Sequence, residues 1–82
     1  MVMYEAGMLA RSKAGHDKAQ MYIIKEVDDT YVYLVDGRIR TLGHPKKKKK
    51  KHVQIVHGIY NMKELDDAGI RKLIKDWKKE EK

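Results

Sequence analysis

The segment Arg11–Gln20, with the sequence RSKAGHDKAQ, joins two stretches that have the composition of β-strands. Gly15 is the expected turning point, because glycine adopts a positive φ without a steric penalty. Asp17 can accept hydrogen bonds from nearby backbone N–H groups and so hold the shape of the loop. The segment therefore predicts a β-hairpin with a basic loop. Its simplest interpretation is a solvated loop, since loops commonly carry charge.

Alternating apolar residues predict strands on both sides of this loop and beyond it. Met8–Ser12 and Gln20–Val27 are the first two strands, and Thr30–Val35 is the strongest strand pattern in the chain. The alternation in the third strand places Val32 and Leu34 on one face, and Tyr31, Tyr33 and Val35 on the other.

Asp36-Gly37 is typical of a two-residue hairpin turn, so we expect a fourth strand at Arg38–Leu42. A fifth strand is predicted at His52–His57. Five short strands joined by tight turns favour a small SH3-like barrel over residues 1–58, with a two-layer sandwich as the alternative. The predicted core residues are Ile24, Val32, Leu34, Ile39, Val53 and Ile55.

After Gly58 the apolar period changes from 2 to 3.6. Residues 59–82 predict a connector, anchored by buried Ile59 and Leu65, and then a helix from about Asp67 to Lys79. Asp66 or Asp67 is expected to cap its start. Its apolar stripe needs a covering surface. We favour the barrel of the same chain, giving one domain overall, and a protein partner is the alternative. The stripe consists of Ile70, Leu73, Ile74 and Trp77.

The net charge of +7 is concentrated in one place. Residues 1–45 carry no net charge and residues 58–82 carry only +1, so Lys46–Lys51 supplies the remaining +6. Such a run fits a disordered solvated loop, a nuclear-targeting signal or an arm that contacts phosphates. Because strands flank the run, we favour the phosphate-contacting arm.

Several residues together resemble a KOW motif, in which a strand, a loop with a central glycine and a second strand open a small SH3-like barrel. The similar residues are Gly7, Met8, Leu9, Ala10, Gly15, Asp17, Lys18, Tyr22, Ile23 and Ile24. With Pro45 and the lysine run, the chain is similar over about residues 5–57 to small KOW-domain RNA-binding proteins, including the fourteen-e family of the large ribosomal subunit. Ala19 stands where that family often has a second glycine.

The resemblance implies a non-catalytic RNA-binding module that binds ribosomal or other structured RNA and acts in or near translation. The predicted RNA-binding residues are Arg11, Lys13, Gly15, His16, Asp17, Lys18, Arg38, Arg40, Lys46, Lys47, Lys48, Lys49, Lys50, Lys51 and His52. Four tyrosines either pack in the barrel or stack on unpaired bases. They are Tyr22, Tyr31, Tyr33 and Tyr60. Alternative functions are an SH3-like protein-interaction module and KOW-type binding of DNA or a transcription complex.

Other function classes have no support in the sequence. There is no cysteine, the four histidines lack metal-ligand spacing, and no catalytic arrangement of Ser, His and Asp is visible. We expect no enzyme activity, no cofactor and no metal. No apolar run approaches the ~20 residues that span a bilayer. We therefore expect no membrane partner, and a cytoplasmic monomer with a possible protein partner for the C-terminal helix.

Overall fold

A computed structural model of the chain describes residues 3–13 and 20–80. These residues form one antiparallel sheet in the order β4-β3-β2-β1-β5, followed by the helix α1. The elements are β1 (Met8–Ser12), β2 (Met21–Val27), β3 (Tyr31–Val35), β4 (Lys46–Lys49), β5 (Val53–Ile59) and α1 (Asp67–Glu80). The predicted fold class, a small mainly β barrel with a C-terminal helix, is confirmed. The sandwich alternative is wrong because the strands form a single sheet.

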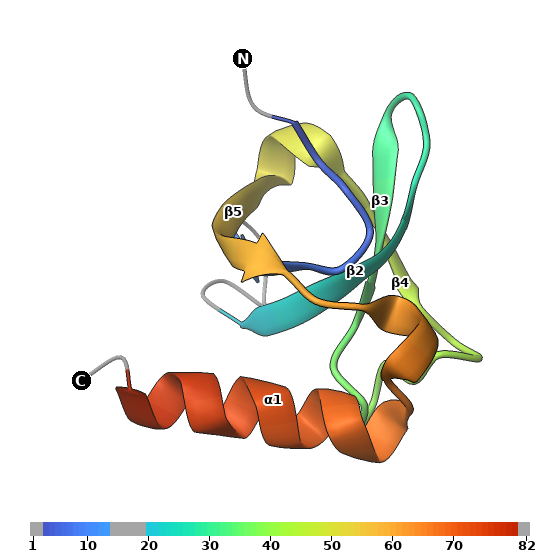
Figure 1. Cartoon of the computed structure of the whole chain (residues 1–82). Coiled ribbons are helices and arrows are strands. Elements are labelled where there is room, and N and C mark those ends of the chain that lie inside the picture. Colours follow the sequence, from blue (N-terminus) through green and yellow to red (C-terminus); the bar gives the residue numbers. More distant parts are fainter. Residues whose placement is uncertain (1–2, 14–19, 81–82) are drawn as a thin grey trace.

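The sheet curls into a half-barrel (Figure 1). Irregular pairing lies between Ile24 and Glu26 where β2 meets β3, and near Leu9 where β1 meets β5. Irregularities of this kind bend a strand and increase its twist. A 3-10 turn at Lys50–His52 then carries the chain from β4, at one end of the strand order, to β5 at the other.

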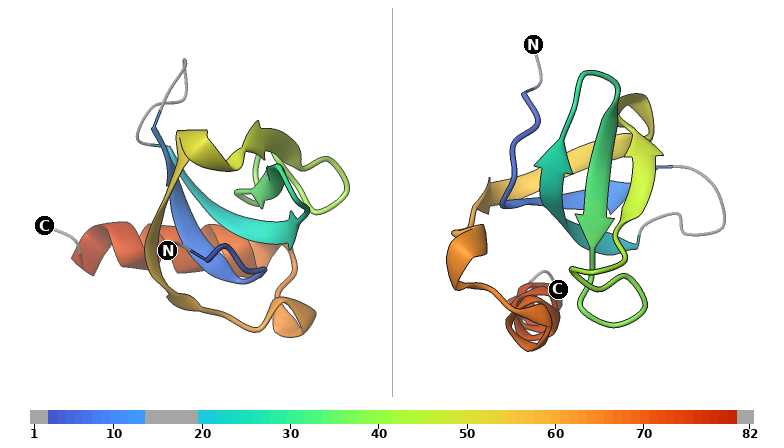
Figure 2. Two further views of the ribbon diagram at one scale, coloured as in Figure 1. Left: turned by 90° about the horizontal axis from the view of Figure 1, so that it is seen from above. Right: turned by 90° about the vertical axis from the view of Figure 1, so that its right-hand side faces the viewer.

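Both faces of the sheet bury apolar side chains. The inner core lies within the curl and consists of Ala10, Tyr22, Ile24, Val32, Leu34 and Val53. The outer core lies between the sheet and α1 and consists of Leu9, Met21, Ile23, Val35, Ile70 and Ile74. Figure 2 shows the helix lying across the outside of the sheet. Two cores explain why β2 is apolar at four successive positions, Met21–Ile24, rather than alternating.

The helix forms as the sequence predicts. Asp66 caps its start, since its side-chain oxygen accepts a hydrogen bond from the Gly69 N–H at 2.7 Å. The predicted stripe faces the sheet: Ile70 and Ile74 are buried, and Leu73 and Trp77 pack beside them. The barrel of the same chain therefore covers the stripe.

The predicted fourth strand, Arg38–Leu42, is wrong, and Asp36-Gly37 is not a two-residue hairpin turn, because the longer segment 36–45 connects β3 to its antiparallel neighbour β4. The Asp36 carboxylate accepts hydrogen bonds from the N–H groups of Arg38 and Arg40, at 2.8 and 3.0 Å. The Arg40 carbonyl accepts from the N–H groups of Asp36 and Gly37. Backbone groups that a strand would pair with a neighbour are used inside this turn. The lysine run supplies β4 instead.

Three smaller expectations are also wrong. Ile39 is 83% exposed rather than in the core, because it lies in the turn that replaces the fourth strand. Ile59 is 60% exposed, because the next residue, Tyr60, packs against the outer core. His52 belongs to the 3-10 turn, so β5 begins one residue later, at Val53.

Candidate nucleic-acid interface

The lysine run is an edge strand followed by a turn rather than a loop or arm. Lys46–Lys49 forms β4 and pairs with β3, so that Lys47 lies opposite Tyr33 and Lys49 opposite Tyr31. Lys50 then donates its backbone N–H to the Thr30 carbonyl at 3.0 Å. The backbone of the run is therefore fixed by the sheet. Lysines on an edge strand also discourage the pairing of further strands, which is a structural role for the same residues.

The pleat of β4 divides its four lysines into two pairs. Lys47 and Lys49 are exposed on the outer face of the sheet. Lys46 and Lys48 are half-buried and lie opposite Leu34 and Val32, whose side chains belong to the inner core. Cross-strand partners lie on the same face of a sheet. The side chains of these two lysines therefore leave the backbone on the inner face of the curl. One ligand on the outer face would meet only the first pair.

Two tyrosines accompany the exposed lysines. Tyr31 and Tyr33 are half-buried on the outer face of β3, as the alternation predicts. The Lys47 Nζ lies 4.2 Å from the centre of the Tyr31 ring, which is a cation–π contact. We call Tyr31, Tyr33, Lys47 and Lys49 the Tyr–Lys face. It combines aromatic surface with positive charge, the combination that single-stranded nucleic acids bind.

Asp28 holds one edge of the Tyr–Lys face. Its carboxylate accepts hydrogen bonds from the N–H groups of Tyr31, at 2.6 Å, and Thr30, at 2.9 Å. The Tyr33 hydroxyl donates to it at 3.0 Å. The Tyr31 N–H, above all, lowers the pKa of the Asp28 carboxyl below its usual range. The hydrogen bond to Asp28 raises the pKa of the Tyr33 hydroxyl. Asp28 therefore orients the phenol of Tyr33.

A second basic group gathers where β1 meets the 3-10 turn. The Lys13 N–H donates to the His52 carbonyl at 2.8 Å, which places Lys13 beside the turn. The Tyr4 hydroxyl donates to the Lys50 carbonyl at 2.9 Å, and the Lys50 Nζ lies 5.9 Å from the Tyr4 ring centre. We call Lys13, Lys50, Lys51 and His52 the basic corner. Lys13 and Lys51 are its exposed members.

The remaining predicted RNA-binding residues lie elsewhere. Arg11 is half-buried on β1, between Met21 of β2 and Gln54 of β5. Arg38 and Arg40 belong to the turn after β3, and Arg38 lines a hollow beside α1. Gly15, His16, Asp17 and Lys18 lie outside the described residues. The Ser12 N–H donates to the Gln20 carbonyl at 3.1 Å, so the described residues that flank that segment adjoin each other.

The structure also distinguishes the tyrosines. Tyr22 is only 4% exposed within the inner core, so it packs and presents no ring to a base. Tyr60 is half-buried against the outer core. Tyr31 and Tyr33 share a face with the exposed Lys47 and Lys49.

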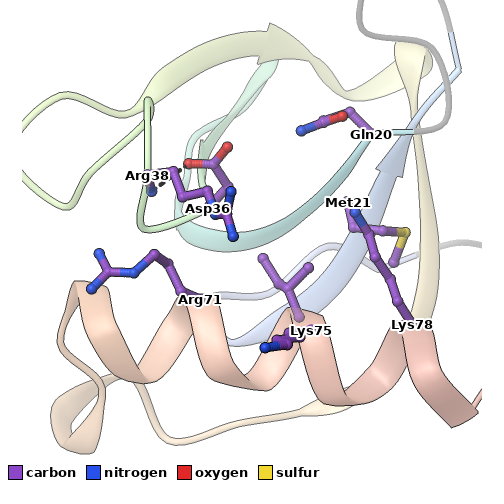
Figure 3. A pocket seen from close by; sticks show the side chains of 8 residues that line it. Gln20, Met21, Asp36, Arg38, Arg71, Lys75 and Lys78 are labelled. Carbon is purple, nitrogen blue, oxygen red and sulfur yellow. Dashed lines mark hydrogen bonds between the residues drawn. The ribbon is translucent and has the colours of Figure 1, made fainter.

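A cleft beside the helix brings together cations that the sequence analysis missed. Arg71, Lys75 and Lys78 of α1 face Arg38 and Gln20 across a hollow of about 230 Å³ (Figure 3). The signal in the sequence was the spacing of Arg71, Lys75 and Lys78 by four and three residues, because this spacing places side chains in one stripe of a helix. We call this hollow the helix cleft. Its other lining residues are Met21, Asp36 and Ile74.

Comparison with known proteins adds no relative. No protein-family model matches the chain, and no curated protein matches it. Within residues 3–13 and 20–80, no three metal-ligating side chains gather into a possible metal site. The helices in the same residues are all too short or too polar to cross a membrane.

Proposed function

We propose that the chain is a non-catalytic RNA-binding module of the KOW type. Its ligand is ribosomal RNA or another structured RNA, and its role lies in or near translation. The observation that carries the proposal is the Tyr–Lys face, where two exposed lysines flank two tyrosine rings on a fixed strand pair. The curled five-stranded sheet is compatible with the fold that the KOW resemblance implies.

The Tyr–Lys face supports unpaired bases and phosphates as ligands together. Aromatic rings stack on bases of any sequence, and lysines neutralise phosphates and release counterions. Because the sheet fixes the backbone of β4, binding costs less conformational entropy than ordering a free lysine tail. The basic corner extends the positive surface with Lys13 and Lys51, both exposed.

The protein-interaction alternative has less support than RNA binding. It depends in part on the apolar stripe of α1, and Ile70 and Ile74 are already buried against the sheet of the same chain. DNA binding shares the charge and the aromatic rings. A single-stranded DNA of matched sequence therefore accompanies every RNA in the test.

The two lysine pairs of β4 supply a matched experiment. Lys47→Gln/Lys49→Gln and Lys46→Gln/Lys48→Gln remove the same charge from the same strand, on opposite faces. Binding to a short RNA hairpin with an unpaired loop is measured by fluorescence anisotropy over a range of salt concentrations. The outer pair should flatten the slope of log affinity against log salt by about 1.4, at about 0.7 per lost contact with single-stranded phosphates.

The inner pair should change the slope by less than half as much. If both pairs change it equally, only total charge matters and the Tyr–Lys face is not the site. Binding of the wild type that does not depend on salt would contradict RNA-backbone recognition altogether. Equal affinity for the matched DNA would favour the DNA-binding alternative.

A further inference from the structure

The helix cleft has a rigid wall. This wall is the turn that follows β3. The Asp36 carboxylate closes the turn by accepting hydrogen bonds from the N–H groups of Arg38 and Arg40. Gly37 has a φ of +78°, and a Cβ there would lie 2.2 Å from the Asp67 carbonyl oxygen, so the turn packs directly on the helix. An Arg71 N–H donates to the Gly37 carbonyl, and the Leu42 N–H donates to the Asp67 carboxylate at 2.8 Å. Arg38 is therefore presented by a turn that the helix holds in place.

Positive charge in the helix cleft exceeds negative charge. Arg38, Arg71, Lys75 and Lys78 line it, and Lys72 lines the adjoining hollow. Among the described residues that line the two hollows, the carboxylates are Asp36 and Asp76. Asp36 is only 8% exposed, and one of its oxygens is occupied by two backbone N–H groups.

The cations of the helix cleft are not neutralised by the fold. In the part of the chain that the structure describes, the side chains of Arg38, Lys75 and Lys78 have no hydrogen bond or ion pair. Like charges held together repel one another unless solvent or an anion compensates them. A preformed hollow with such an excess indicates an anionic ligand.

The shape and lining favour the phosphates of an extended chain. Among the described residues that line the hollow, only Met21 and Ile74 are apolar and none carries an aromatic ring, so it offers no slot for a base. The stripe from Arg71 to Lys78 extends about 10 Å along the helix, at about 1.5 Å per residue. That length suits successive phosphates better than a single small anion.

We infer that the helix cleft is a second phosphate-contact site for the RNA backbone, separate from the Tyr–Lys face, an assignment that rests on the proposed RNA binding. Arg38 and Arg71 would clamp phosphate oxygens through their planar guanidinium groups, and Lys75 and Lys78 would act as point charges. The RNA footprint would then extend from the uncovered part of the sheet to the helix side of the domain.

The test replaces exposed cations in the helix cleft and compares them with a charge-matched control. Arg38→Gln/Lys75→Gln removes two charges from the cleft and leaves Arg71 bound to the Gly37 carbonyl. Lys25→Gln/Lys63→Gln removes two exposed charges from residues that do not line the cleft. Because the Lys25 Nζ donates to the Leu42 carbonyl at 2.8 Å, thermal melting verifies that this control keeps its fold. With the same RNA hairpin, the cleft variant should flatten the salt slope by about 1.4 and weaken binding about tenfold near physiological salt. The control should change the slope by less than half of that.

Further arms separate failure of this site from failure of RNA binding. If Lys47→Gln/Lys49→Gln flattens the slope and the cleft variant does not, the second site is overturned and the proposed function stands. If RNA binding by the wild type does not depend on salt and no variant changes it, both the second site and the proposed RNA binding are overturned. Equal effects of cleft and control variants also overturn the site. Amide shifts in NMR with sodium tripolyphosphate identify one more outcome: tripolyphosphate binding in the cleft without an RNA effect would assign the cleft to a small phosphate ligand and overturn the inference.

Discussion

The outer face of the sheet has a covered half and an uncovered half, and both include residues of β3. Val35, at the end of β3, is buried with Ile23 under α1. Tyr31 and Tyr33, on the same face of the same strand, are half-buried and are not part of the outer core that packs with α1. The buried side chains of the covered half have no aromatic ring, whereas the uncovered half combines phenol rings with lysines. A face that needed only solubility would not require the two rings, so the difference supports the RNA binding that we propose for the uncovered half.

The largest expected effect lies in the covered half. Ile70→Ala should lower the free energy of unfolding by about 2–5 kcal/mol, because it leaves a cavity between helix and sheet. Ile39→Ala removes the same atoms from a side chain that is 83% exposed, so it should change stability by less than about 0.5 kcal/mol. Urea unfolding followed by circular dichroism measures both. Equal effects would mean that the helix does not cover the sheet in solution.

The uncovered half should respond in binding rather than in stability. Tyr31→Leu removes the ring and should weaken binding to the unpaired loop of the RNA hairpin by about 1–3 kcal/mol, the range for loss of one stacked base. Tyr31→Phe keeps the ring and should retain most of the affinity. Fluorescence anisotropy measures binding, and thermal melting verifies that each variant is folded. If Tyr31→Leu binds as well as Tyr31→Phe, the ring packs and does not stack.

The sequence predicted the covered half better than the uncovered one. The spacing of Ile70, Leu73, Ile74 and Trp77 specifies a helix stripe, and the alternation in Thr30–Val35 specifies which residues share a face. Each pattern lies within one segment of the chain, and the folded structure keeps the faces that such a local pattern predicts. The faces of Tyr31 and Tyr33 were therefore predictable, but the lysine strand that pairs beside them was not.

The position of the lysine run was not predictable in the same way. Lysine has a low preference for strands, so six lysines in a row give no strand signal. The run becomes β4 because the edge of β3 needs a partner and Arg38–Leu42 is unavailable. Arg38–Leu42 does not form a strand because the Asp36 carboxylate accepts hydrogen bonds from two of the backbone N–H groups in this region, those of Arg38 and Arg40. Strand propensity and the alternation of apolar residues do not predict such side-chain to backbone hydrogen bonds. The position of Arg38 opposite the helix cations depends on the same turn and was missed for the same reason.

The smallest expected effect concerns the edge of the uncovered half, at Asp28. Hydrogen bonds from the Tyr31 N–H and then the Thr30 N–H lower the pKa of this carboxyl from an ordinary value of 3.8, so folding favours its ionised form. A carboxyl with a lowered pKa stabilises the fold above the ordinary pKa. That contribution is lost as the pH falls below 3.8 and through the lower pKa of the folded state. Asp28→Asn should therefore reduce the pH dependence of stability in this acidic range, measured by urea unfolding at a series of pH values.

The same substitution tests whether Asp28 controls the Tyr–Lys face. The hydrogen bond to Asp28 raises the pKa of the Tyr33 hydroxyl from an ordinary value of 10.0. Asp28→Asn keeps a hydrogen-bond acceptor at this position but removes the negative charge, so the pKa of Tyr33 should fall back toward 10.0. NMR titration with ring-labelled tyrosine resolves Tyr33 from the other tyrosines. If the pKa of Tyr33 stays the same in the variant, the phenol is not held by Asp28. The uncovered half would then be a set of independent side chains rather than a preorganised surface.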